Sequence, residues 1–290
     1  MTEDAFEIFS ETKCKVGEGP IWHPDQNRLI WFDILGQAMF ASDGTDEVRW
    51  DFDEVVSAAG VVDAHRLLVA TESGLILFDT RDATSEIVKV LEADAPERRS
   101  NDGRADRQGG FWFSTMGKAA EAGFGRIYRY WKGEVRLLVE DLTIPNAICF
   151  SPAGDVAYYA DTPDQRVLRL ALDPETGWPV GAPDVLVDLR EAGLNPDGAI
   201  VDAAGTVWVA CWGVASVIGF DAGGNEVGRF EVPTPHASCP GLGGVNLDRL
   251  FVASATHDLP EADHAADAPA GKTFCLDVSL KGLAEPRVIL

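Results

Sequence analysis

Short runs of alternating apolar and polar residues repeat along the whole chain, and the runs break at Gly, Pro, Asp and Asn. The neighbouring segments 65–73 (HRLLVATES) and 74–80 (GLILFDT) illustrate the pattern. A period of two residues is typical of a half-buried β-strand, and glycine and proline mark the turns between strands. No segment keeps a helical apolar period over the length of a helix. The chain is therefore predicted to be all-β.

One phrase, a turn followed by an apolar strand, returns along the chain. It is clearest in residues 17–33, 101–117, 145–161 and 196–213, and two weaker copies cover residues 58–71 and 241–254. Repeats spaced by roughly 40–50 residues are the signature of a β-propeller, in which each repeat forms one blade. The six copies predict a six-bladed β-propeller that spans residues 1–290 as a single domain.

Each copy has an equivalent position five residues before the start of its turn. Four copies place an oxygen-bearing side chain there: Glu18, Asn101, Asn146 and Asp197. Equivalent positions of successive blades face one central channel, so these side chains should converge near its axis. The other two copies have Ala58 and Gly241 there, which suggests a gap where a ligand could enter.

The four polar residues form an oxygen-only set of two carboxylates and two amides. Such donors suit Ca²⁺, Mg²⁺ or Mn²⁺ better than Zn²⁺. An asparagine or aspartate before a turn often only bonds the local backbone, which is the simpler interpretation for any single residue. Four equivalent positions favour a shared site, and Glu18 between two glycines has no turn role of its own. The sequence predicts a central-channel site for one divalent metal ion.

Three charged residues lie near these positions in the sequence. Arg99 is two residues before Asn101 and so shares its side of an extended segment, where it could bind substrate oxygens or form a surface salt bridge. Asp102 could orient Asn101, bind substrate or serve the turn. Glu121 lies in a glycine-containing loop, residues 118–125, from which it could reach the channel mouth or remain a solvated charge.

Two further segments carry structural predictions. Residues 5–10 and 285–290 are both predicted to form short strands. We expect these two chain ends to pair in one blade and so to close the propeller. Residues 257–270 are a polar insertion in the last blade. Its His257, Asp258, Glu261 and His264 resemble a metal-binding pattern, but the Pro- and Ala-rich setting favours an exposed loop.

The composition of the chain and the motifs it lacks exclude several classes of function and partner. Net charge is −23, with 47 acidic and 24 basic residues, which argues against nucleic acid and anionic membranes as partners. Five widely spaced cysteines, an odd number without a CxxC motif, favour a reducing compartment. The start lacks a signal peptide, and no 18-residue apolar run occurs, so a cytoplasmic protein is expected. There is no GxSxG elbow, P-loop or Rossmann fingerprint.

Four segments together resemble the regucalcin/gluconolactonase family, within it the bacterial sugar-lactone hydrolases. They are residues 17–22 (GEGPIW), 99–116 (RSNDGRADRQGGFWFSTM), 145–162 (PNAICFSPAGDVAYYADT) and 196–210 (PDGAIVDAAGTVWVA). The resemblance covers nearly the whole chain. It implies a six-bladed propeller with one divalent metal on the axis, and hydrolysis of aldonolactones to aldonic acids. The oxygen donors favour Ca²⁺, and the resemblance also permits Zn²⁺, Mn²⁺ or Fe²⁺.

The resemblance also implies roles for single residues. Glu18, Asn146 and Asp197 would bind the metal, with Asp197 also the general base and Asn101 a second catalytic residue. Arg99, Asn101 and Glu121 would bind a small sugar lactone.

Two positions depart from the family pattern. Ala147 stands where the family usually has glycine, and in residues 240–244 (PGLGG) a leucine replaces an aromatic residue, which could reshape the sugar pocket. Two other functions stay open: a metal-dependent esterase or organophosphatase using the same residues, and a non-enzymatic calcium-binding propeller.

Overall fold

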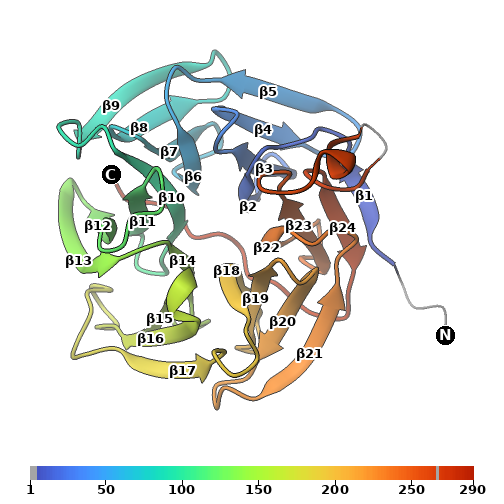
Figure 1. Ribbon diagram of the computed structural model, residues 1–290. Coiled ribbons are helices and arrows are strands. Elements are labelled where there is room, and N and C mark those ends of the chain that lie inside the picture. Colours follow the sequence, from blue (N-terminus) through green and yellow to red (C-terminus); the bar gives the residue numbers. More distant parts are fainter. Residues whose placement is uncertain (1–4, 266–267) are drawn as a thin grey trace.

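A computed structural model describes residues 5–265 and 268–290 of the chain. Within these residues, 24 strands form six four-stranded antiparallel sheets arranged around a central axis (Figure 1). The fold is thus the predicted all-β, six-bladed propeller. No helix among the described residues is long and apolar enough to cross a membrane.

The innermost strand of each blade surrounds the axis and contacts the innermost strands of the neighbouring blades. These six strands are β2 (Gly17–His23), β6 (Val56–Val61), β10 (Arg98–Ala105), β14 (Pro145–Phe150), β18 (Asn195–Val201) and β22 (Ala237–Gly243). They are almost entirely buried, because each is covered by its own sheet and by the adjacent blades. Each begins where its sequence repeat predicts a new blade.

The other strands run outward in order. Blades one to three add β3 (Arg28–Asp33), β4 (Ala38–Ser42), β5 (Glu47–Asp51), β7 (Arg66–Thr71), β8 (Gly74–Asp79), β9 (Thr84–Val90), β11 (Phe111–Gly117), β12 (Gly125–Trp131) and β13 (Glu134–Leu142). Blades four to six add β15 (Val156–Asp161), β16 (Arg166–Ala171), β17 (Asp184–Asp188), β19 (Val207–Trp212), β20 (Ser216–Phe220), β21 (Glu226–Glu231), β23 (Arg249–Ser254), β24 (Thr273–Asp277) and β1 (Glu7–Ser10). The short 3₁₀ segments η1 (Thr162–Asp164) and η2 (Glu261–His264) lie in loops.

The propeller closes through its N-terminal strand, as predicted. Strand β1 pairs with β24 and forms the outer edge of the last blade. The prediction that residues 285–290 are a strand of this blade is wrong, because β1 already occupies the only free edge of β24. The C-terminal segment instead lies against blades two and three, where the Val288 amide donates to the Val61 carbonyl at 2.7 Å.

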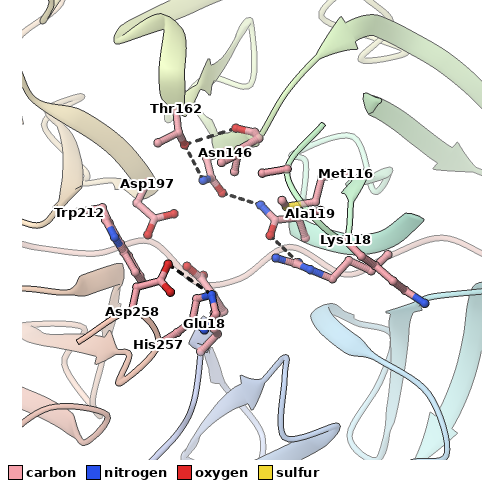
Figure 2. Close-up of a pocket in the computed structure, with 15 residues that line it drawn as sticks. Glu18, Met116, Lys118, Ala119, Asn146, Thr162, Asp197, Trp212, His257 and Asp258 are labelled. Atoms are coloured by element: carbon pink, nitrogen blue, oxygen red, sulfur yellow. Dashed lines mark hydrogen bonds and ion pairs between the residues drawn. The ribbon is translucent and has the colours of Figure 1, made fainter. Parts of the chain in front are cut away.

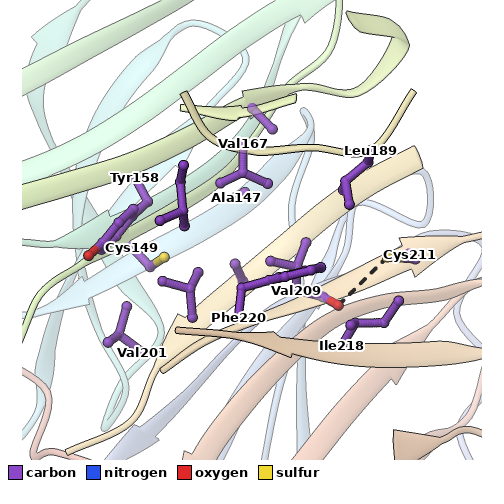
Figure 3. Close-up of a cluster of buried hydrophobic side chains, with 14 residues drawn as sticks. Ala147, Cys149, Tyr158, Val167, Leu189, Val201, Val209, Cys211, Ile218 and Phe220 are labelled. Carbon is purple, nitrogen blue, oxygen red and sulfur yellow. Dashed lines mark hydrogen bonds between the residues drawn. The ribbon is translucent and has the colours of Figure 1, made fainter. Parts of the chain in front are cut away.

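Neighbouring blades pack through apolar faces. Between blades four and five, Tyr158 and Val167 of one sheet meet Val209 and Phe220 of the other (Figure 3). Burial of apolar surface contributes about 25 cal/mol for each Å² removed from water, so such clusters supply most of the stability of the ring. The alternation that predicts the strands arises here, since one face of each strand must fill a gap between blades.

The repeated turn also has a repeated role. In blade three, the Asp106 carboxylate accepts the Trp112 indole N–H at 3.1 Å as well as two backbone amides of its own turn. In blade five, Asp202 makes the same bonds and accepts from Trp208 at 2.9 Å. These two tryptophans are buried between blades. Equivalent geometry at the turns places the residues five positions earlier at equivalent points of the inner strands.

Candidate active site

Four predicted site residues of the inner strands, Glu18, Asn101, Asn146 and Asp197, lie at β-bulges. The strand register shifts directly after Glu18, after Asn146 and after Pro196, and between Ser100 and Gly103. A bulge bends the strand locally and re-aims a side chain. Gly19 follows Glu18 with φ 56°, and a Cβ there would lie 2.7 Å from the Ser57 carbonyl oxygen, so only glycine fits. The bulges turn the polar side chains toward the axis.

A chain of hydrogen bonds joins these side chains across blades three, four and five (Figure 2). Arg99 Nη1 donates to Asn101 Oδ1 at 2.8 Å, and Asn101 Nδ2 donates to Asn146 Oδ1 at 2.9 Å. Asn146 Nδ2 donates to the Thr162 hydroxyl at 2.8 Å, which in turn donates to the Pro196 carbonyl oxygen. The network fixes the orientation of both amides.

The side chains open into a cavity of about 350 Å³ at one end of the channel. Its lining comes from blades one, three, four, five and six and comprises Val16, Glu18, Arg99, Asn101, Met116, Lys118, Ala119, Ala120, Ile144, Asn146, Thr162, Asp197, Trp212, His257 and Asp258. The structure therefore brings together Glu18, Asn101, Asn146, Asp197 and Arg99. A cavity of this size is suited to a small, monosaccharide-sized ligand.

Two buried carboxyl groups and one guanidinium lie together at the inner end of the cavity. Burial raises the pKa of Glu18 to about 8, and the charge of the nearby Asp102 adds to the rise. Burial also raises the pKa of Asp197 well above its usual range, and the charge of Glu18 adds to this. The charges of Glu18 and Asp197 favour protonated Arg99, but its burial outweighs them and lowers its pKa to about 10. Two buried carboxylates thus share one neighbouring guanidinium.

This arrangement fits a hard divalent cation. Glu18, Asp197 and the amide oxygen of Asn146 could supply oxygen ligands, and a cation would relieve the repulsion between the two carboxylates. Throughout residues 5–265 and 268–290, no three His, Cys, Asp or Glu side chains gather with metal-binding geometry. Any metal here would therefore need the asparagine oxygen, consistent with a preference for Ca²⁺, Mg²⁺ or Mn²⁺ over Zn²⁺.

Arg99 has one of the two roles that the sequence left open, and Asp102 has a role that the sequence did not predict. Arg99 faces the cavity and bonds Asn101, so it is not a surface salt bridge. Asp102 lies behind the cavity lining, where its carboxylate accepts the backbone amides of Gly103 at 2.7 Å and of Ile148 at 2.7 Å. Asp102 therefore joins strand β10 to strand β14 beneath the site and does not face the ligand.

Glu121 is not part of the lining as the structure describes it. Its carboxylate accepts the Ala119 amide within its own loop at 3.1 Å. The same loop contributes Lys118, Ala119 and Ala120 to the cavity instead.

Other expectations about the cavity wall need correction. The small residues Ala58 and Gly241 do not open a gap for a ligand. They are buried where inner strands approach closely, and a Cβ on Gly241 would lie 2.9 Å from the Pro20 carbonyl oxygen. Leu242, in the segment expected to shape the sugar pocket, packs into the apolar core with Trp208 and Leu250.

Several lining residues were not predicted from the sequence. Thr162 follows the blade-four repeat, and only its bond to Asn146 reveals its role. Trp212 ends strand β19 and differs from the other tryptophans because it lines the cavity. His257 and Asp258 begin the exposed insertion, as expected, yet they also reach the cavity. The sequence signal that could have placed them at the cavity was their position in the last blade, shortly after strand β23.

Comparison with known proteins places this geometry in a family. The sequence profile of the SMP-30/gluconolactonase/LRE-like region matches residues 16–256. The chain is 33% identical to pentonolactonase XacC of Haloferax volcanii, over 96% of each protein. It is 32% identical to the L-arabinolactonase of Azospirillum brasilense, over 97% of this chain and 94% of that protein.

A solved structure is similar over nearly its full length. It is a calcium-binding protein, regucalcin, from Agrobacterium tumefaciens, with a TM-score of 0.96 and 36% identity over 99% of this chain and 98% of that one. The family profile covers most of the chain and includes all six inner strands. The chain therefore belongs to the SMP-30/gluconolactonase/LRE-like family.

Proposed function

We propose that the protein is a metal-dependent lactonase that hydrolyses a sugar aldonolactone to its aldonic acid. The observation that carries the proposal is the convergence of Glu18, Asp197 and Asn146, beside Arg99 and Asn101, at the inner end of one cavity. The pentonolactonase and L-arabinolactonase relatives support hydrolysis of a lactone ester.

Glu18, Asn146 and Asp197 would hold one divalent cation, with Ca²⁺ the best match to their oxygen atoms and to the name of the similar solved structure. When bound, such an ion supplies Lewis-acid polarisation of the lactone carbonyl and stabilises developing negative charge. Zn²⁺, Mn²⁺ and Fe²⁺ are alternatives for the experiment to separate.

The protein's own groups would carry the proton transfers and hold the substrate. Asp197 accepts a proton from the water that attacks the carbonyl carbon, and the proton then passes to the ring oxygen as the carbon–oxygen bond of the lactone breaks. Arg99 donates hydrogen bonds to substrate oxygens. Asn101 binds the substrate through its amide oxygen, which can accept from a hydroxyl, because its two N–H groups already donate to Pro145 and Asn146. The bond between Arg99 and Asn101 presets their orientation. Contact of Glu121 with the substrate requires its loop to move from the geometry seen here.

The decisive experiment is acid release from a panel of aldonolactones by chelator-stripped protein, with each divalent cation added back in turn. Spontaneous hydrolysis is subtracted from each rate. Metal-restored turnover is expected for the wild type, and Asp197→Asn should lose about a thousandfold or more. The matched control is Asp141→Asn, an exposed aspartate on strand β13 outside the cavity.

The same assay separates the alternatives. Faster hydrolysis of aryl esters or organophosphates than of any lactone would favour a metal-dependent esterase. Tight metal binding without turnover of any substrate would favour a calcium-binding propeller. We further propose a cytoplasmic location, because all five cysteines are buried free thiols, which persist in a reducing compartment.

A further inference from the structure

One wall of the cavity has no role in the proposed chemistry. Trp212, His257 and Asp258, here called the outer wall, come from blades five and six, whereas Lys118, Ala119 and Ala120 come from the loop after β11 in blade three. Figure 2 shows the carboxylate of Asp258 on the same side of the cavity as Glu18 and Asp197. The outer wall is therefore placed to contact the part of a ligand that lies away from Arg99 and Asn101.

Backbone bonds hold this wall in place. The His257 amide donates to the Lys15 carbonyl at 3.0 Å, and His236 Nδ1–H donates to the His257 carbonyl at 2.9 Å. The His236 ring also stacks on Trp212, with 3.9 Å between ring centroids. His236 thus couples the indole of Trp212 to the backbone that carries Asp258.

Asp258 adopts a conformation that favours glycine. It has φ 62° in a turn closed by the bond from the Leu259 amide to the Thr256 carbonyl. Aspartate tolerates this region better than most residues, but glycine would adopt it without strain. The turn therefore holds the Asp258 carboxylate at a defined place on the cavity wall.

The charges along the cavity differ between its two ends. Lys118 Nζ is paired with Glu72 Oε1 at 2.5 Å, and its ammonium points away from the inner residues (Figure 2). The exposed His257 ring lies 3.5 Å from the Asp258 carboxylate. Among the described residues no Lys or Arg pairs with Asp258, so its carboxylate adds negative charge at the mouth. At the inner end, Arg99 instead offsets part of the charge of Glu18 and Asp197.

We propose that Asp258 determines substrate specificity by accepting hydrogen bonds from the hydroxylated tail of an uncharged lactone and by disfavouring lactones with an anionic tail. Trp212 offers its ring to the apolar face of the sugar, as aromatic side chains do in ligand sites. The inference rests on the proposed lactonase function. The net charge of −23 acts in the same direction, because it lowers the local concentration of anionic substrates.

The test compares two substrates that share one ring: D-glucono-1,5-lactone and its 6-phosphate. The ratio of kcat/KM for the phosphate over the neutral lactone is measured for the wild type, Asp258→Asn and Asp258→Lys. Asparagine keeps the size of the side chain and tolerates positive φ. The same two substitutions at Asp141 are the control, because Asp141 is exposed, has φ 62° and lies outside the cavity.

The ratio should rise about five- to tenfold in Asp258→Asn and further in Asp258→Lys, as expected for a dianion several ångströms from a solvated carboxylate. The rise should shrink at high salt, and the Asp141 variants should keep the wild-type ratio. An unchanged ratio in both Asp258 variants that still hydrolyse the neutral lactone overturns the specificity role alone. A wild type that hydrolyses no lactone of the whole aldonolactone panel with any cation overturns the lactonase function, and this inference with it.

Discussion

The Asn101 side chain donates its amide N–H to the Asn146 side-chain oxygen at 2.9 Å, across the boundary between blades three and four. Asn101 also accepts from Arg99, so one asparagine orients both a proposed metal ligand and a proposed substrate-binding residue. Groups that orient a metal ligand typically change metal affinity by 10- to 100-fold when removed.

Asn101→Ala should therefore weaken metal binding about tenfold as well as lower kcat/KM. Calorimetric titration of the stripped protein with Ca²⁺ and Mn²⁺ measures the first effect, and lactone hydrolysis at saturating metal measures the second. Thermal unfolding of the variant checks that the propeller is intact. Metal affinity equal to that of the wild type would show that Asn146 does not depend on Asn101 for its orientation.

The metal-free protein should lose stability as pH rises from about 5 to about 8. The folded pKa of Glu18 is raised from 4.5 to about 8, and that of Asp197 is raised as well, so the folded protein keeps protons that the unfolded chain releases. The stabilising contribution is complete below the ordinary pKa and is lost as pH rises through the folded pKa. Urea unfolding in chelator from pH 5 to pH 9 measures this loss, at roughly 3 kcal/mol.

Two comparisons identify the groups responsible for the pH dependence of stability. Glu18→Gln should flatten the dependence, because the neutral amide has no proton to lose. A divalent cation should restore stability most at pH 8, because cation binding favours ionised ligands and releases protons. Stability of the metal-free wild type that increases between pH 5 and pH 8 would contradict the assignment.

Asp102 should be needed for stability rather than for contact with substrate. Asp102→Ala leaves the amides of Gly103 and Ile148 without their acceptor in a buried position. Each unpaired buried group costs about 1–3 kcal/mol, so the total should reach several kcal/mol in denaturant unfolding. Asp102→Asn keeps one acceptor oxygen and should lose about half as much. Equal stability of the alanine variant and the wild type would show that other groups or water satisfy these amides.

The blade count and the inner residues could be predicted because both follow from the repeat. A turn such as that of Asp106 or Asp202 fixes the register of its blade, and the register fixes which residue faces the axis. Ala58 and Gly241 occupy equivalent positions, but whether a small residue leaves space or lets two strands approach depends on its neighbours in other blades. That information is not in the repeat.

The outer wall was missed for a similar reason. Trp212, His257 and Asp258 follow the ends of strands, where loop conformation sets the direction of each side chain. The left-handed φ of Asp258 and the stacking of His236 on Trp212 have no sequence signature. The composition of the C-terminal segment is typical of a strand. It does not join the last blade, however, because β1 already pairs with the free edge of β24.

The contact of the C-terminal segment with the channel gives a further prediction. Arg104 on strand β10 and Glu285 form a buried ion pair at 2.5 Å, and Arg104 also donates to the Pro20 carbonyl at 3.3 Å. Removing one partner of a buried pair leaves an uncompensated charge and costs about 3–5 kcal/mol. Glu285→Ala should therefore destabilise the protein by about that amount in denaturant unfolding.

The double variant Arg104→Met/Glu285→Leu should recover most of the loss, because apolar side chains of similar volume avoid the cost of burying charge. Since Glu285 lies outside the cavity lining, kcat/KM of the folded Glu285→Ala protein should match the wild type. The control is Lys281→Ala, which breaks only the exposed pair with Asp248 and should cost less than about 1 kcal/mol. A loss for Glu285→Ala no larger than that of this control would show that the C-terminal segment does not secure the propeller through Arg104.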